Sequence, residues 1–335
     1  MGIYRCNHCK HIQEHILHRS MPQTKCAQCG QDVTVYDTVQ FVAHIIHRWA
    51  AVARELEALK NQESQQSVSE QEQAQERHQN VLGNVQFTDT DILANAQQHQ
   101  PLLNWFQQKA IRAQFNYDAV NMSGYYDEAA EAMGKHYAVF KDIVGRIGWA
   151  YRNNHSGLNL DLKKYSQKEA QQINNICREF YSHTLFSRYV YQKQEKLVHL
   201  KLQSAAPIRQ FFSGEWLEWY ALGKLLAYAE KQGKHYVFSC ARNAEIYFSN
   251  DDKHELDVVF LAKNKLPLVI ECKTGEYRRD LDKYLTLRKR LDIPAENFVL
   301  LVTDIDETQA KSLSSMYELT FVTLSMLPQY IQSVI

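Results

Sequence analysis

Three charged residues near the C-terminal end of the chain lie in apolar surroundings, and their types are suited to metal-dependent chemistry. Asp257 stands between two apolar residues, and Glu271 ends the apolar run 268–270. A buried carboxylate is costly unless it is paired or bound to a cation. Lys273 follows Glu271 by two residues, so on a strand the two side chains share one face.

These residues need a hairpin to bring them together, and the sequence predicts one over 254–273. Two apolar runs flank the polar turn 263–265, a pattern typical of paired strands. Asp257 and Glu271 on neighbouring strands can hold Mg²⁺ or Mn²⁺, and Lys273 can orient a water and offset charge in the transition state. This is the chemistry of phosphodiester hydrolysis. The alternative is a surface hairpin with an ordinary Glu271–Lys273 ion pair.

A helix predicted to begin at residue 214 supplies further carboxylates. Glu215 and Glu218 are three residues apart, so they lie on one helix face. Either residue is a candidate third acid of the site.

The order of these motifs carries a family resemblance. GEWLE (214–218), ELDVV (255–259) and IECKT (270–274) resemble the PD-(D/E)xK nuclease superfamily. More narrowly, they resemble the nuclease half of CRISPR-ancillary effectors, in which such a nuclease is joined to a cyclic-oligonucleotide sensor (CARF) domain. The resemblance covers roughly residues 207–325. It implies a restriction-endonuclease-like fold, Mg²⁺ or Mn²⁺ dependence, cleavage of DNA or RNA, and a setting in prokaryotic defence.

The resemblance also implies roles for single residues. The matching catalytic positions are Glu218, Asp257, Glu271 and Lys273. Tyr284 and Arg288, on the helix that follows, are expected to contact a phosphate or to support the site. The N-terminal part carries cysteine pairs in place of a CARF sensor, so the resemblance does not extend to activation by a cyclic oligonucleotide.

Two cysteine pairs near the N-terminus have the spacing of a zinc ribbon. Cys6 and Cys9 form one pair, and Cys26 and Cys29 form the other. Four thiolates complete a tetrahedral Zn²⁺ site, which is closed and therefore structural. The ribbon is suited equally to contacts with nucleic acid and with protein.

The stretch 137–210 contains 12 Lys and Arg against 5 Asp and Glu, with aromatic residues interleaved. Such a surface can follow a phosphate backbone and stack bases. The alternative is that the aromatic residues form a core and the charges a solvated helical face. The predicted nucleic-acid contacts are Arg146, Arg152, Lys163, Lys164 and Arg188.

Periodicity and composition predict a multidomain chain. The expected parts are a zinc ribbon (1–36), an amphipathic helix with a Gln- and Glu-rich linker (37–80), a helical middle region (81–205) and an α/β restriction-endonuclease-like domain with a mixed sheet (206–335). Lys and Arg together number 38, as do Asp and Glu, so overall charge favours no partner. No apolar run reaches the roughly 18 residues of a membrane span, which predicts a cytoplasmic protein.

Three function classes remain open from the sequence. The first is a metal-dependent endonuclease with a nucleic-acid partner. The second is an inactive nucleic-acid-binding or scaffolding protein with a nuclease-like fold. The third is an interaction protein built on the 38–80 helix, which predicts a stable oligomer. A homodimer, or a protein partner bound through the ribbon or this helix, is compatible with the first class.

Overall fold

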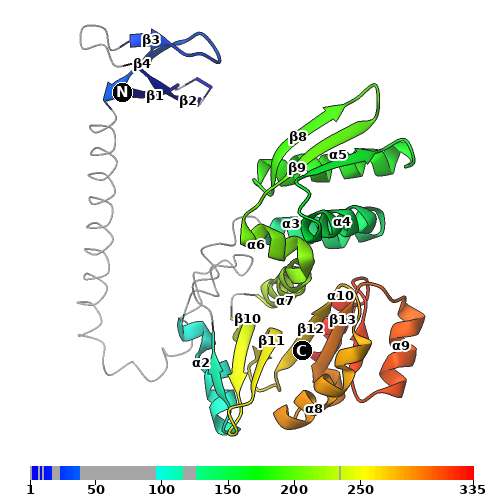
Figure 1. Ribbon diagram of the computed structural model, residues 1–335. Coiled ribbons are helices and arrows are strands. Elements are labelled where there is room, and N and C mark those ends of the chain that lie inside the picture. Colours follow the sequence, from blue (N-terminus) through cyan, green and yellow to red (C-terminus); the bar gives the residue numbers. More distant parts are fainter. Residues whose placement is uncertain are drawn as a thin grey trace, which may run out of the picture. The chain divides into compact units, whose positions relative to one another are not determined.

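The computed structural model describes residues 2–6, 8–9, 11–16, 23–37, 96–115, 126–233 and 235–335. The chain divides into two compact units, Met1–Gln79 and Asn80–Ile335 (Figure 1). The amphipathic helix and linker predicted for 37–80 lie, from residue 38 onward, outside the described residues. Among the helices that the structure describes, none has the length and apolar character needed to cross a membrane.

The first unit contains two small antiparallel sheets, with strand orders β2-β1-β5 and β3-β4. Their strands are β1 (Gly2–Arg5), β2 (Ile12–His15), β3 (Gln23–Lys25), β4 (Asp32–Thr34) and β5 (Tyr36–Asp37). Its apolar core consists of Tyr4, Val33 and Val35 beside the cysteines. A core of this size is too small to stabilise a fold without a further constraint.

The second unit is built on a six-stranded sheet of order β14-β13-β12-β11-β10-β6. The strands are β6 (Arg112–Gln114), β10 (Phe238–Tyr247), β11 (Lys253–Ala262), β12 (Leu268–Lys273), β13 (Phe298–Val302) and β14 (Thr320–Val322). The β12–β13 and β13–β14 pairs are parallel, and the other pairs are antiparallel. The predicted mixed sheet is confirmed.

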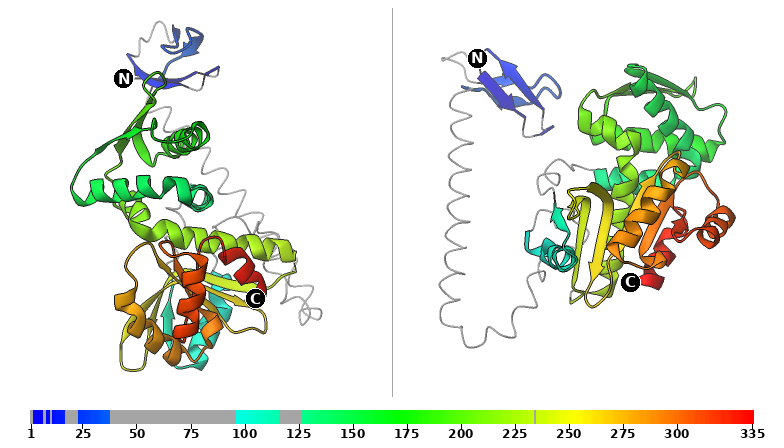
Figure 2. Two further views of the ribbon diagram at one scale, coloured as in Figure 1. Left: turned by 90° about the vertical axis from the view of Figure 1, so that its right-hand side faces the viewer. Right: turned by 60° about the horizontal axis from the view of Figure 1, so that its bottom comes forward.

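Helices cover both faces of this sheet (Figure 2). One apolar cluster joins one face to α7 (Trp216–Gln232) and α10 (Leu327–Val334), and a second joins the other face to α2 (Ala96–Gln108), α8 (Leu281–Leu291) and α9 (Glu307–Met316). We call these the α7 face and the α8 face. Four short helices complete the described part of the domain: α6 (Ala206–Gln210), η5 (Phe211–Glu215), η6 (Arg278–Asp280) and η7 (Ala295–Asn297).

The middle region contains strands that the sequence analysis did not predict. Beside α3 (Tyr126–Lys135), α4 (Tyr137–Arg152) and α5 (Gln167–Ser182), it has a sheet of order β7-β9-β8, formed by Gly157–Asp161, Leu197–Leu202 and Phe186–Gln192. Ser166 and Glu169 form a capping box before α5. One apolar cluster extends from this region to the α7 face, and the boundary at residue 205 stays a prediction.

The edge of the six-stranded sheet also differs from expectation. β10 is a single strand of ten residues. β6 pairs with β10, and α2 packs its apolar residues Leu102 and Phe106 on the α8 face. Residues 96–114, predicted to belong to a helical domain, therefore belong to the sheet domain.

Candidate active site

The predicted hairpin is formed by β11 and β12, and it brings the two acids together. The antiparallel register pairs Val258 with Ile270, and its continuation places Asp257 opposite Glu271. The backbone N–H of Cys272 donates a hydrogen bond of 2.7 Å to Asp257 Oδ2. Two carboxylates therefore stand side by side at the end of the hairpin.

Both carboxyl groups are largely removed from water, and this perturbs their protonation. The Glu271 side chain is buried, and its Oε1 atom has no hydrogen-bond partner among the described residues. Burial, and next the charge of Asp257, raises the pKa of Glu271 well above its ordinary value. Burial also raises the pKa of Asp257. Two neighbouring carboxylates need a positive charge to ionise together, so a divalent cation fits this pair.

Lys273 shares a strand face with Glu271, as predicted from the ExK spacing. Its ammonium lies 3.7 Å from Asp280 Oδ2 and 5.4 Å from the centre of the Tyr284 ring. Tyr284 is buried, and burial, together with the charges of Glu271 and Asp257, raises the pKa of its hydroxyl. Tyr284 thus lies beside the Lys273 ammonium, and its expected supporting role stays a prediction.

An irregular turn positions the acids of α7. Gly214 in η5 has a φ of 153°, and a Cβ atom there would lie 3.4 Å from Thr274 Oγ1 at the end of β12. A glycine allows both this conformation and the close approach. The turn therefore directs the start of α7, with Glu215 and Glu218, toward the end of the hairpin.

Glu218 is engaged by an arginine on β10. Arg242 Nη1 lies 2.7 Å from Glu218 Oε2 and 3.9 Å from Glu215 Oε2, and its guanidinium stacks on the Trp219 ring at 4.2 Å. Burial and the charge of Asp257 raise the pKa of Glu218 to about 8, although Arg242 acts in the opposite direction. In the described part of the chain, the cysteine cluster is the only group of three or more closely spaced potential metal ligands. Asp257 and Glu271 thus form a pair, and Glu218 is near enough for the charge of Asp257 to raise its pKa but does not complete a three-ligand cluster with them.

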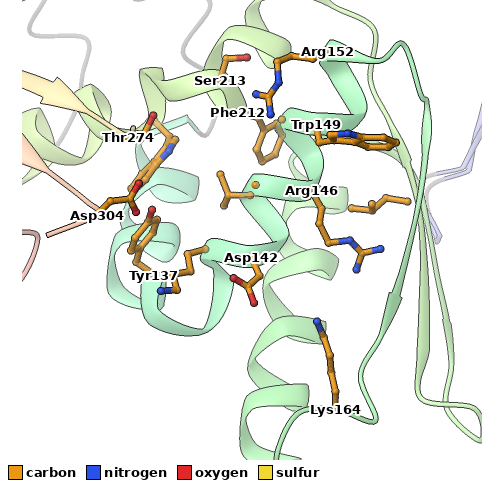
Figure 3. A pocket seen from close by; sticks show the side chains of 16 residues that line it. Tyr137, Asp142, Arg146, Trp149, Arg152, Lys164, Phe212, Ser213, Thr274 and Asp304 are labelled. Carbon is orange, nitrogen blue, oxygen red and sulfur yellow. The ribbon is translucent and has the colours of Figure 1, made fainter. Parts of the chain in front are cut away.

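A cleft of about 810 Å³ extends from the end of β12 to α4. Thr274 and Asp304, which follow β12 and β13, lie on one side of it, and Arg146, Trp149 and Lys164 lie on the other (Figure 3). Thr274 directly follows Lys273 in the chain, but Asp257, Glu271 and Lys273 do not themselves line the cleft. Its further charged lining residues are Lys141, Asp142 and Arg152.

The cleft contains three of the predicted nucleic-acid contacts. Arg146, Arg152 and Lys164 line it, whereas Lys163 and Arg188 are exposed elsewhere on the surface. Trp149 is 53% exposed and stacks on His155 with ring centroids 5.0 Å apart. Position in the sequence could not distinguish the basic residues that line the cleft from those that only belong to the same basic stretch, 137–210.

The structure gives the Arg288 side chain partners at the turn after α8, and its expected phosphate contact stays a prediction. Its Nη1 atom donates to the Ile293 carbonyl at 3.1 Å, and its Nη2 atom donates to Glu318 at 2.7 Å. Asp292, between α8 and this carbonyl, has a φ of 53°. Arg288 therefore secures the turn after α8.

The four N-terminal cysteines form a cluster in which all Sγ atoms lie within 4.8 Å of one another. Each pair is held by a backbone turn, in which the N–H of Cys6 donates to the His11 carbonyl and that of Cys26 donates to the Gln31 carbonyl, both at 2.8 Å. The hydrogen bond from the Cys9 backbone lowers the pKa of the Cys6 thiol to about 6. Thiolates at this spacing fit a zinc ribbon, as predicted.

Comparison with known proteins gives one family match. Residues 206–297 match the family described as Card1-like, endonuclease domain. This segment includes η5, the hairpin with Asp257, Glu271 and Lys273, and α8. The match agrees with the predicted resemblance to a nuclease for this part of the chain, which is similar to a Card1-like endonuclease domain.

Two solved structures are similar to about two-thirds of the chain. One is protein VC1899 from Vibrio cholerae, with 17% identity, a TM-score of 0.45, and coverage of 69% of this chain and 60% of that chain. The other is Can2 from Sulfobacillus thermosulfidooxidans in complex with cyclic tetra-adenylate, with 18% identity, a TM-score of 0.47, and coverage of 69% and 59%. The matches thus span about three-fifths of the length of these proteins. No curated protein matches the chain.

Proposed function

We propose that the chain is a metal-dependent endonuclease that hydrolyses phosphodiester bonds in DNA or RNA. The match to the Card1-like endonuclease domain supports the reaction class and a setting in prokaryotic defence. One observation carries the metal dependence: Asp257 lies beside the buried Glu271, whose Oε1 atom has no hydrogen-bond partner among the described residues. A hard divalent cation would supply that partner.

Each residue of the site has a role in this proposal. Asp257 and Glu271 hold Mg²⁺ or Mn²⁺ through their oxygens. When bound, such an ion acidifies a coordinated water and neutralises charge on the phosphate. Lys273 orients the attacking water and offsets the charge that develops in the transition state. The Tyr284 ring and Asp280 keep the Lys273 ammonium close to the carboxylates.

The cleft is the proposed path of the nucleic acid toward this centre. Arg146, Arg152 and Lys164 would bind phosphates, and the half-exposed Trp149 ring offers a surface for a base. Arg146 already has a fixed position, because its Nη2 atom donates to the Asn159 carbonyl at 2.6 Å. The zinc ribbon, holding a structural Zn²⁺, is proposed to recruit the enzyme through nucleic acid or protein.

Cleavage assays with matched variants test the proposal. Single- and double-stranded DNA and RNA are incubated with Mg²⁺ or Mn²⁺ and the wild-type protein, Asp257→Ala or Lys273→Ala. Both substitutions are expected to slow cutting by at least about 100-fold. The controls are Lys263→Ala and Lys265→Ala, exposed residues in the turn of the same hairpin, which should cut at the wild-type rate.

Two other results of the cleavage assay would contradict the proposed function. Unchanged cutting by both site variants would show that the chemistry lies elsewhere. Nucleic-acid binding without cutting by any of the proteins would instead support the inactive binding or scaffolding protein.

A further inference from the structure

Asn243, in the middle of β10, has a backbone conformation that is foreign to a strand. Its φ is 52°, in the left-handed region that residues other than glycine seldom adopt. Seven other non-glycine residues in the described part of the chain share a positive φ, and all of them lie in turns or loops between elements: Ala110, Asn154, Thr184, Lys196, Asp251, Asn264 and Asp292. Within the described residues, Asn243 is alone in adopting it inside a strand.

The position of Asn243 in the sheet relates it to the acids of the site. The register of β10 and β11 pairs Arg242 with Val258 and Ala244 with Leu256. Asn243 therefore stands opposite Asp257, whose other neighbour across the sheet is Glu271. The unusual backbone lies in the same row of the sheet as both carboxylates.

In both strands, the alternation of side chains between the α7 face and the α8 face is broken at this row. On β10, Ala241 lies on the α8 face, but the next residues on that face are Ala244 and Ile246 instead of 243 and 245. On β11, Leu256 lies on the α8 face, whereas Val258 lies on the α7 face. Strict alternation is thus broken at Asn243 on one strand and at Asp257 on the other.

This break explains how the Asp257 side chain is directed. A side chain at a regular strand position stands roughly perpendicular to the sheet. Asp257 instead reaches sideways to its neighbouring strand, where the N–H of Cys272 donates to its Oδ2 atom. The hydrogen bond holds the carboxylate near the plane of the sheet, beside Glu271.

We propose that Asn243 is a positioning residue of the active site. Its left-handed backbone breaks the alternation of side chains in β10 at the same row as the break in β11. The two matching breaks keep Asp257 beside Glu271. The Asn243 Oδ1 atom is buried without a hydrogen-bond partner among the described residues, so no hydrogen bond to this atom maintains the conformation. The inference rests on the proposed function, because it concerns the carboxylate that would hold the cation.

Direct measurement of Mn²⁺ binding tests the inference without reliance on cleavage. The full-length, zinc-loaded protein is titrated with Mn²⁺, the free ion is measured by electron paramagnetic resonance, and binding that persists in Asp257→Ala is subtracted. Asn243→Ala should weaken binding by about 10- to 100-fold, the usual effect of losing support for a metal ligand. Asn243→Gly should stay within about threefold of the wild type, because glycine adopts a positive φ without strain.

Asn264→Ala is the matched control. Asn264 has a φ of 61° in the turn between β11 and β12, so this substitution imposes a similar backbone cost away from the carboxylates. It should lower the melting temperature as Asn243→Ala does and leave the Mn²⁺ affinity unchanged.

Two results would overturn the inference. Wild-type affinity in a folded Asn243→Ala would show that the conformation is not needed. A folded Asn243→Gly that binds Mn²⁺ weakly would assign the role to the amide, and this result decides the question even if Asn243→Ala does not fold. Equal binding by the wild type and Asp257→Ala is a different failure, since it would refute the proposed metal site itself.

Discussion

The cysteine cluster of the first unit and the carboxylate pair of the second offer a cation different surroundings. Four Sγ atoms, each from a backbone turn, are gathered within 4.8 Å, so thiolates would fill every position around a tetrahedral ion. Asp257 and Glu271 offer two carboxylates at the end of the β11–β12 hairpin, and an ion there would keep positions for water and phosphate. The number of protein ligands therefore separates the structural role proposed for the first site from the catalytic role proposed for the second.

The largest effect that would sharpen this comparison is expected at the cysteines. Cys26→Ser should abolish zinc binding and unfold the ribbon, because the free energy of zinc binding in such modules is about 10 to 16 kcal/mol and is also their folding free energy. Zinc content and limited proteolysis of the full-length chain measure this. Cys177→Ser, at a buried cysteine outside the cluster, is the control for zinc content. An intact ribbon without zinc would contradict the structural role.

A smaller effect, on nucleic-acid binding, is expected at the cleft, which is the proposed path of the substrate to the carboxylate pair. Arg146→Gln and Arg152→Gln together should weaken nucleic-acid binding by about tenfold or more, since a hydrogen bond to a charged group contributes about 1.5 to 3 kcal/mol. The dependence of binding on salt should decrease by about one unit of slope for each cation removed. Fluorescence anisotropy over a salt series measures both quantities.

Arg188→Gln is the comparison for the cleft variants. Arg188 lies on β8 and does not line the cleft, so its loss should matter less. An equal effect at Arg188 would place the nucleic acid along the whole basic segment instead of in the cleft.

A third expected effect concerns pH and the metal-free site. The pKa of Glu218 is raised from 4.5 to about 8, chiefly by burial. The folded protein thus retains a proton that the unfolded chain releases. The resulting stability is complete below pH 4.5 and is lost as the pH rises through 8. The free energy of unfolding should therefore fall over this range by at most about 1.4 kcal/mol per pH unit from this group.

Urea unfolding of the metal-free protein at several pH values measures this fall. Glu218→Gln should make it shallower. Glu245→Gln should not, because Glu245 is paired with Lys253 at the surface and its pKa is lowered by that hydrogen bond. An unchanged slope in Glu218→Gln would mean that Arg242 keeps Glu218 ionised.

Features set by short stretches of sequence could be predicted. Two apolar runs and a polar turn predicted the β11–β12 hairpin, and with it the pairing of Asp257 and Glu271. The spacing of the cysteines predicted their cluster, because each knuckle is formed by a few consecutive residues. In both regions the chemistry depends on neighbours in the chain or across one turn.

Features set by distant contacts could not be predicted. Arg242 engages Glu218 from another element, and no local pattern reveals that pair. The positive φ of Asn243 could not be predicted, because asparagine occurs in many backbone conformations. The alternating leucines of β7 and β9 were a usable signal, but these short strands lie among helices whose periodicity dominated the interpretation.

The pairing of β6 with β10 has a practical consequence for anyone who wishes to isolate the nuclease. β6 is three residues long and covers Glu245–Tyr247 of β10, with the guanidinium of Arg112 stacked on the Tyr247 ring. Uncovered strand edges tend to pair with other chains, and short charged strands prevent this. A fragment cut at residue 206 would expose that edge together with the apolar surface beneath α2, and it would be prone to aggregation. The smallest soluble nuclease should therefore begin before α2.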